Sequence, residues 1–257
     1  MYSPLEGSRG DSAHQCGMNI NCCVANGSRG YMMIPRFAVM TSPGEVYINL
    51  YSDFSAQFNL SDNNEVTLKQ KTSYPEGDKI SLSVFPKNPK NFTIALRIPD
   101  WSRQNSIFVN GEEVKGIASE GYAKIAREWK EDDKIELQLD LRGRLVKLNG
   151  HAAILREPIA LARDSRFNDG FVDEAAVIQN KNSFVDLKVS DTKPRGVWLS
   201  FTAPLKLGTG IASTSEEPSQ IHFCDFGSAG NSWDSNTCYR VWLPESLNIM
   251  NDKIESY

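Results

Sequence analysis

The sequence has no apolar run of about 18 residues, the length at which a membrane-spanning helix is expected. It also has no excess of basic residues, because 28 Lys and Arg stand against 32 Asp and Glu, for a formal net charge of -4. The basic residues are scattered along the chain rather than clustered, which argues against a nucleic-acid partner. We therefore expect neither a membrane span nor nucleic acid binding.

Cysteine is scarce and odd in number, since the chain has five. A complete disulfide framework within one chain is therefore excluded. A single bridge between Cys224 and Cys238 and a pair of separate thiols both remain open. The first residues, "MYSPLEGSRGDSAHQCG", are polar and contain no apolar stretch, so we expect no signal peptide there.

Two of the five cysteines are adjacent, Cys22 and Cys23, within "GMNINCCVANGSRG". Such a pair suggests a strained disulfide, a metal site or a reactive thiolate. At the start of a helix, the partial positive charge of the helix N-terminus would favour thiolates, which bind metals and act as nucleophiles. Cys16 and His14 could complete a zinc site, although the spacing is not that of a zinc finger. Two half-buried thiols without a function are the alternative.

The hydrophobic pattern changes period near residue 41. Residues 22–40 have helical spacing interrupted by glycines and Pro35, which predicts one helix or two short pieces. Alternation then begins in "EVYINLYSDFSAQFNL", and Asn110-Gly111 is a hairpin signal. Short strands at spacings of about 8–12 residues are typical of an antiparallel sandwich.

The alternation is lost briefly around "LRGRLVKLNGHAAILREPIALARDSRF" and then resumes. We place a domain boundary near residue 150. The predicted organisation is a helical segment over residues 1–41, a first antiparallel β-sandwich over 42–150, and a second over 151–257. The predicted fold class is therefore mainly β.

Five tryptophans divide into two groups. Trp129, Trp198 and Trp242 lie within apolar alternation, which favours packing in a core. Trp101, in "IPDWS", and Trp233, in "AGNSWDS", have loop-like surroundings. Exposed indoles can stack on sugar rings, so these two are the candidates for glycan contact.

Four carboxylates cluster in "ARDSRFNDGFVDEA", namely Asp164, Asp169, Asp173 and Glu174. A glycosidase that works by two carboxylates needs them about 5–10 Å apart in a cleft. An ordinary polar loop explains the same cluster, and it is the favoured interpretation.

The chain contains the stretches "HQCGMNINCCVANGSRG", "LRIPDWSRQNSIFVNGEEV" and "FCDFGSAGNSWDSNTCYRVWLP". Together they resemble one enzyme family, the β-L-arabinofuranosidases of glycoside hydrolase family 127 and their close relatives. "HQCGMNINCCVANGSRG" resembles the end of the family's catalytic domain. "LRIPDWSRQNSIFVNGEEV", with the strands after it, is similar to the β-sandwich that follows, and "FCDFGSAGNSWDSNTCYRVWLP" resembles the C-terminal segment. The double cysteine is the most specific of these elements.

The resemblance implies a particular chemistry. Family members begin with an (α/α)6 barrel, in which a glutamate and three cysteines hold zinc, and a separate glutamate is the acid/base. Carried over by position, Cys22 would be the nucleophile and a zinc ligand, and Cys23 a second zinc ligand. The nucleophile forms a thioglycosyl intermediate, so the anomeric configuration is retained.

The remaining family residues lie upstream of the double cysteine, within barrel helices. We therefore expect this chain to be the C-terminal part of such a hydrolase, with a helical barrel remnant at 1–41. We expect it to be inactive alone and to bind zinc weakly or not at all. The resemblance also implies an arabinose-containing plant glycan, a barrel partner or a homodimer, and a periplasmic or extracellular setting. The alternative function is a non-catalytic β-sandwich module that binds glycans or docks on a catalytic subunit.

Overall fold

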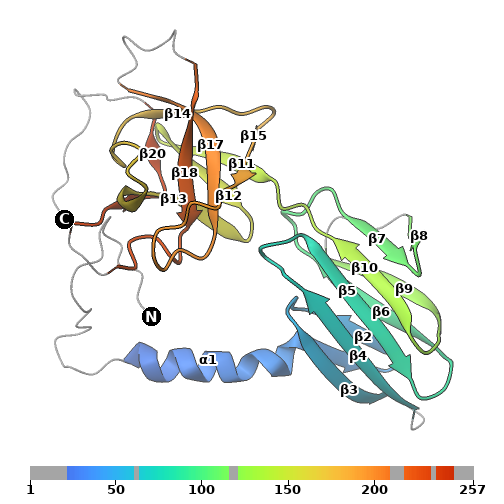
Figure 1. Cartoon of the computed structure of the whole chain (residues 1–257). Coiled ribbons are helices and arrows are strands. Elements are labelled where there is room, and N and C mark those ends of the chain that lie inside the picture. The colour runs from blue at the N-terminus through green and yellow to red at the C-terminus, as the bar shows by residue number, and fades with distance from the viewer. Residues whose placement is uncertain (1–21, 61–63, 116–120, 209–216, 233–235, 246–257) are drawn as a thin grey trace. The chain divides into compact units, whose positions relative to one another are not determined.

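The computed structural model describes residues 22–60, 64–115, 121–208, 217–232 and 236–245. These residues form two compact units that divide between Leu141 and Arg142. The N-terminal unit spans Cys22–Leu141, and the C-terminal unit begins at Arg142 (Figure 1). Each unit has its own hydrophobic core, so each is described by itself below.

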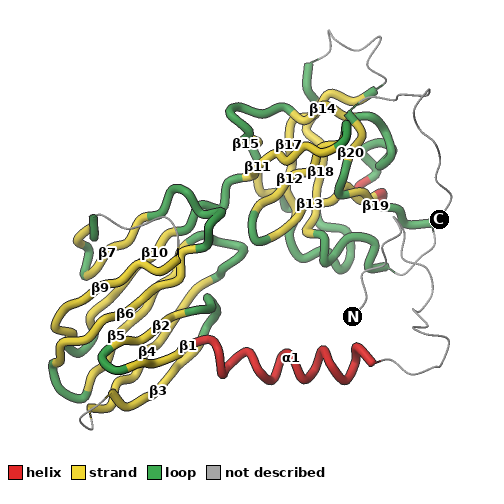
Figure 2. The backbone as a smooth tube through the Cα atoms, turned by 180° about the vertical axis from the view of Figure 1, so that it is seen from behind, coloured by secondary structure: helices red, strands yellow, loops and turns green. Residues whose placement is uncertain are grey.

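The helix α1 (Cys22–Ala38) leads directly into strand β1 (Val39–Ser42) (Figure 2). It is one continuous helix, because Pro35 lies in its last turn, where few backbone hydrogen bonds remain to be lost. Asn49 caps its C-terminal end. The Asn49 backbone N–H donates to the carbonyl of Ala38, and its side-chain amide donates to that of Phe37, both at 2.9 Å. Carbonyls that the last turn leaves free are thereby satisfied.

Two sheets make up the rest of the N-terminal unit (Figure 1). The four-stranded sheet has the order β1, β2 (Glu45–Ile48), β6 (Lys90–Ile98) and β9 (Gly121–Trp129). The six-stranded sheet has the order β3 (Phe54–Leu60), β4 (Asn64–Thr72), β5 (Lys79–Pro86), β10 (Asp133–Gln138), β7 (Ser106–Val109) and β8 (Glu112–Glu113). Both sheets contribute to one core, as in a β-sandwich.

Alternation along the strands explains how the sandwich core forms. Val46 and Ile48 of β2 are fully buried, whereas Tyr47 between them is half-buried on the outer face. Trp129, at the end of β9, is also fully buried, and its indole N–H donates to the carbonyl of Phe92 at 2.9 Å. The predicted core position of Trp129 is confirmed.

The predicted sandwich was wholly antiparallel, and one strand pair differs. β2 and β6 pair in parallel, with Val46 opposite Ile94. Between them the chain crosses to the other sheet, forms the three strands β3, β4 and β5, and returns in the original direction. The long connection is what a parallel pair requires, because no tight turn can join parallel strands.

The C-terminal unit contains one ten-stranded sheet. Its main path has the order β14 (Ala176–Ile178), β17 (Ser200–Leu207), β18 (Ser219–Asp225), β13 (Ile159–Asp164), β12 (His151–Arg156), β11 (Gly143–Leu148) and β15 (Phe184–Val185). Three short strands pair beside this path: β16 (Lys188–Val189) with β17, β19 (Tyr239–Arg240) with β13, and β20 (Leu243–Pro244) with β12. β11, which the sequence assigned to the first domain, pairs with β12 and β15 here.

The second sandwich was predicted as two sheets, and the strands are instead hydrogen-bonded into one. Buried residues from β11 through β18 belong to a single core, so the sheet must curl around it. β13 makes this possible, because it pairs with β12 at one end and with β18 and β19 at the other. The mainly β character of the chain is confirmed.

Across the part of the chain that the structure describes, α1 included, no helix is long and apolar enough to cross a membrane.

Candidate functional site

The adjacent cysteines lie in α1, within its first described turn. A 17-residue helix has a substantial positive partial charge at its N-terminal end. A helix N-terminus favours thiolate over thiol, and the reactive character of Cys22 and Cys23 stays a prediction. His14 and Cys16 lie outside the described residues.

A zinc ion needs about four ligands in a closed site, and Cys22 with Cys23 would supply two. Among the described residues there is no group of three or more His, Cys, Asp or Glu side chains that could hold a metal ion. The described part of the chain therefore does not furnish a full zinc site.

The two proposed glycan-contact tryptophans have different outcomes. Trp101 follows β6 in a turn, is half-buried, and packs against the core of the N-terminal unit. Trp233 lies outside the described residues.

Two of the three tryptophans predicted to be in a core are on the surface. Trp198 is 46% exposed and Trp242 is 40% exposed. Around Trp198 the side chains do alternate between buried and exposed, as predicted. The buried ones are its neighbours Val197 and Leu199, so the prediction that Trp198 faces the core was wrong. An indole therefore points outward from this segment of the C-terminal unit.

The carboxylates of "ARDSRFNDGFVDEA" act structurally. Asp169 accepts from the backbone N–H of His222 at 2.7 Å, and its carboxylate lies 3.2 Å from the His222 ring nitrogen Nδ1. Asp173 forms an ion pair with Arg240. These pairings support the polar-loop interpretation over a catalytic carboxylate pair.

Arg163 lies beneath this loop with 1% of its surface exposed. Burial lowers the pKa of Arg163, and the carboxylates of Asp169, Glu174 and Asp173 oppose that shift. Its Nη2 lies 3.5 Å from the carbonyl of Asp169, while Nε and Nη1 have no hydrogen-bond partner in the structure described. Gly170 allows the loop to approach, since a Cβ there would lie 3.1 Å from Nη2.

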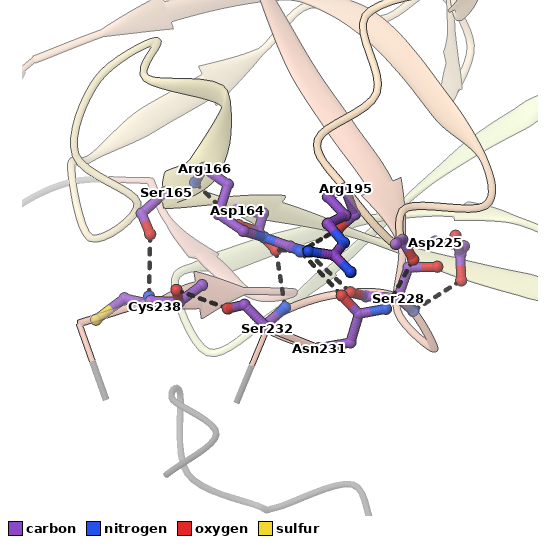
Figure 3. A network of polar contacts seen from close by, with 12 residues as sticks. Asp164, Ser165, Arg166, Arg195, Asp225, Ser228, Asn231, Ser232 and Cys238 are labelled. Atoms are coloured by element: carbon purple, nitrogen blue, oxygen red, sulfur yellow. Dashed lines mark hydrogen bonds and ion pairs between the residues drawn. The ribbon is translucent and has the colours of Figure 1, made fainter. Parts of the chain in front are cut away.

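A second polar cluster, centred on Asp164 and Arg166, was not anticipated from the sequence (Figure 3). The Asp164 side chain is fully buried. It accepts from Arg166 Nε at 2.9 Å, Arg166 Nη2 at 2.7 Å, the Arg166 backbone at 3.0 Å and the Gly230 backbone at 2.8 Å. Burial raises the pKa of Asp164, but the hydrogen bonds from Arg166 and Gly230 outweigh it, so the pKa is lowered.

Arg166 extends this cluster to two further segments. Its Nη1 donates to the Asn231 side-chain oxygen at 2.9 Å and to the carbonyl of Arg195 at 3.1 Å. Its Nη2 donates to the carbonyl of Ser228 at 2.9 Å. We name residues Asp164, Arg166, Asp225, Ser228 and Asn231 the Asp164 network. It joins β13 to the segments 195–199 and 225–231, far apart in the sequence.

The cysteines of the C-terminal unit are separate thiols. Cys224 is buried and Cys238 is half-buried, and both are free. Burial raises the pKa of the Cys224 thiol, so it remains protonated near neutral pH. The proposed bridge between them is not present.

Comparison with known proteins points to one family. Residues 45–141 match the family model described as the middle domain of GH127 β-L-arabinofuranosidases. The resemblance expected from the sequence is therefore confirmed, and its firmest part is the N-terminal sandwich. The search of the curated proteins found no match.

Solved structures agree with this result. A GH127 β-L-arabinofuranosidase from Geobacillus stearothermophilus T6 is 22% identical with a TM-score of 0.70, covering 87% of this chain and 37% of its own. A protein described only as a glycoside hydrolase is 23% identical with a TM-score of 0.73, covering 87% and 39%. A GH127 β-arabinofuranosidase is 25% identical with a TM-score of 0.73, covering 92% and 40%. The chain therefore spans about two fifths of the length of these proteins.

Proposed function

We propose that this chain is the C-terminal part of a retaining glycoside hydrolase that resembles the β-L-arabinofuranosidases. One observation carries the proposal. The double cysteine lies in α1, and α1 leads through β1 into residues 45–141, the segment that matches the GH127 middle domain. The order of these parts is the order that the resemblance implies.

Cys22 is the proposed nucleophile, with Cys23 beside it as a zinc ligand. The start of α1 favours the thiolate that nucleophilic attack requires. Two thiols are half of a zinc ligand set. The resemblance assigns no residue of this chain as the acid/base glutamate. The chain alone should therefore bind zinc weakly and should not hydrolyse arabinofuranosides. Its proposed substrate in the whole enzyme is an arabinose-containing glycan.

The test compares two proteins. The first is the chain as given, and the second is the chain extended by the coding DNA immediately upstream in the source genome. We expect an aryl β-L-arabinofuranoside to be hydrolysed only by the extended protein, and Cys22→Ser to abolish that activity. The matched control is Cys238→Ser, which makes the same change at a free thiol of the C-terminal unit and should retain the activity.

Hydrolysis by the given chain alone, lost on Cys22→Ser, would contradict the proposal. So would an extended protein that hydrolyses the substrate equally well with Cys22→Ser.

A second candidate function is a module that docks on a catalytic subunit. It is favoured by the apolar side chains that α1 leaves exposed, among them Tyr31, Met32 and Phe37 at 63%, 78% and 49%. Exposed apolar side chains gathered on one helix are typical of an interaction surface. Light scattering after size exclusion separates the outcomes. Co-elution of the chain with the separately expressed upstream-encoded segment, lost in Met32→Glu, supports docking on a catalytic subunit, and separate elution of the two at high concentration counts against it.

A further inference from the structure

Trp198 is held more firmly than an exposed aromatic residue requires. Its backbone N–H donates to the Ser228 hydroxyl at 3.0 Å. The next residue, Leu199, donates its N–H to the Asp225 carboxylate at 3.0 Å. Since Leu199 is buried and Trp198 is 46% exposed, these bonds fix the direction in which the indole leaves the surface.

The residues before Trp198 are held in the same way. The carbonyl of Gly196 accepts from the Asn231 side-chain amide at 2.7 Å, and the carbonyl of Arg195 accepts from Arg166 Nη1 at 3.1 Å. Figure 3 shows Arg195 and Asn231 on either side of the Arg166 guanidinium. The side chains of the Asp164 network therefore anchor both sides of Trp198 along the chain.

The anchoring side chains are themselves fixed. Asp225 accepts from the Ser228 backbone N–H at 2.9 Å through its other oxygen, and Arg166 is paired with buried Asp164. A loop held this way loses little conformational entropy when a ligand binds to it. A rigid aromatic side chain supported by a second layer of hydrogen bonds is the usual form of a binding anchor.

The surroundings of Trp198 indicate the class of ligand. Besides Trp198, the exposed residues of the two joined segments are Arg195, Gly196 and Gly227, which are polar or lack a side chain. The centre of a protein interface is depleted in charge and richer in apolar area. An indole with polar neighbours suits instead a ligand that has an apolar face and a rim of hydroxyl groups.

We propose that Trp198 is the stacking platform of a sugar-binding site on the C-terminal unit. The C–H face of a sugar ring packs on the indole, and the exposed Arg195 of the same segment is the proposed partner for its hydroxyls. The site is separate from the cysteine chemistry and needs no hydrolysis. Only the choice of an arabinose-containing sugar rests on the proposed function.

Titration calorimetry on the whole chain tests the proposal with two probes, a linear arabino-oligosaccharide and a linear cello-oligosaccharide. We expect the chain to bind the arabino-oligosaccharide and Trp198→Ala to weaken binding about ten-fold or more, as for loss of an aromatic anchor. Trp198→Phe should retain most of the affinity. Trp242→Ala removes a similarly exposed indole of the same unit and should change the affinity less than about two-fold.

Thermal unfolding of Trp198→Ala should match that of the unchanged chain, because the anchoring bonds use the backbone. If the chain binds neither probe, or if Trp198→Ala binds as the unchanged chain does, the proposal is overturned. Equal losses in Trp198→Ala and Trp242→Ala would also overturn it. Binding of the cello-oligosaccharide alone, lost in Trp198→Ala, would support the site and count against the arabinose-containing substrate.

Discussion

Replacing Asp164 by Asn tests whether the Asp164 network stabilises the C-terminal unit. The change keeps the shape of the side chain but removes its charge and turns one acceptor oxygen into a donor. Arg166 would then face an amide across bonds that are now 2.9 and 2.7 Å long. Leaving one charge of a buried pair without its partner costs about 3–5 kcal/mol.

The size of the effect follows from the size of the unit. For a domain of about 100 residues, 1 kcal/mol changes the unfolding temperature by roughly 4–8 °C. Asp164→Asn should therefore lower the unfolding temperature of the C-terminal unit by about 12 °C or more. Scanning calorimetry measures this, and the transition of the N-terminal unit, which contains none of the network, should not move.

Glu245→Gln is the matched control. It is also a carboxylate-to-amide change in the C-terminal unit, and Glu245 pairs with Lys147 at 2.5 Å with both side chains partly exposed. Such a pair contributes less than about 1 kcal/mol. If Asp164→Asn shifts the transition no further than Glu245→Gln does, the assignment of the network as a stabilising element is refuted.

Three further predictions concern Trp129, Gly170 and Asp164. Trp129→Ala removes a fully buried indole and its hydrogen bond to the carbonyl of Phe92. Urea unfolding should show the N-terminal unit destabilised by about 3–5 kcal/mol. A loss below about 1 kcal/mol would contradict the core position of Trp129. Gly170→Ala should lower the unfolding temperature, because φ is +119° and the Cβ would lie 3.1 Å from Arg163 Nη2; an unchanged temperature would count against that packing. The lowered pKa of Asp164 stabilises the fold above the unfolded-state pKa of about 4, and the contribution is lost as pH falls through the folded-state value. Acid titration of stability should therefore be flatter in Asp164→Asn, and equal slopes would refute the linkage.

Local patterns predicted the parts of the fold that depend on near neighbours. Asn110 and Gly111 have φ of 53° and 84°, which is the geometry of the two-residue turn that the sequence indicated. β7 and β8 pair on either side of it. The alternation at Val46 and Ile48 likewise matched their burial, because one face of each strand meets the opposing sheet.

Features that depend on distant pairing were not predictable from the sequence. The parallel pairing of β2 with β6 reflects three intervening strands in the other sheet, which no local period records. Trp198 shows a second reason. The hydrophobic pattern of "VWLS" predicts that side chains alternate between buried and exposed, but it does not predict which of them face the core. The backbone N–H groups of Leu199 and Trp198 donate to the side chains of Asp225 and Ser228, so this segment is held by partners that lie far away in the sequence.

The Asp164 network was hidden for the same reason. Asp164 and Gly230 are 66 positions apart and Arg166 and Asn231 are 65 apart, and "FGSAGNS" in isolation has the composition of any polar loop. Pairing of β13 with β18 and β19 brings these segments together. Once they are close, the buried carboxylate requires donors, and Arg166 supplies them.

The cysteine pair is the opposite case, because its chemistry depends on residue type and local backbone alone. A thiolate is favoured at the start of a long helix, so the prediction of reactive thiols at residues 22 and 23 needs only the residue type and a helix such as α1. Substrate selection needs a cleft, and zinc needs about two more ligands. The described residues of the N-terminal unit do not supply those ligands. Reactivity and specificity are thus contributed by different parts of the proposed enzyme, and the extended protein is where they would meet.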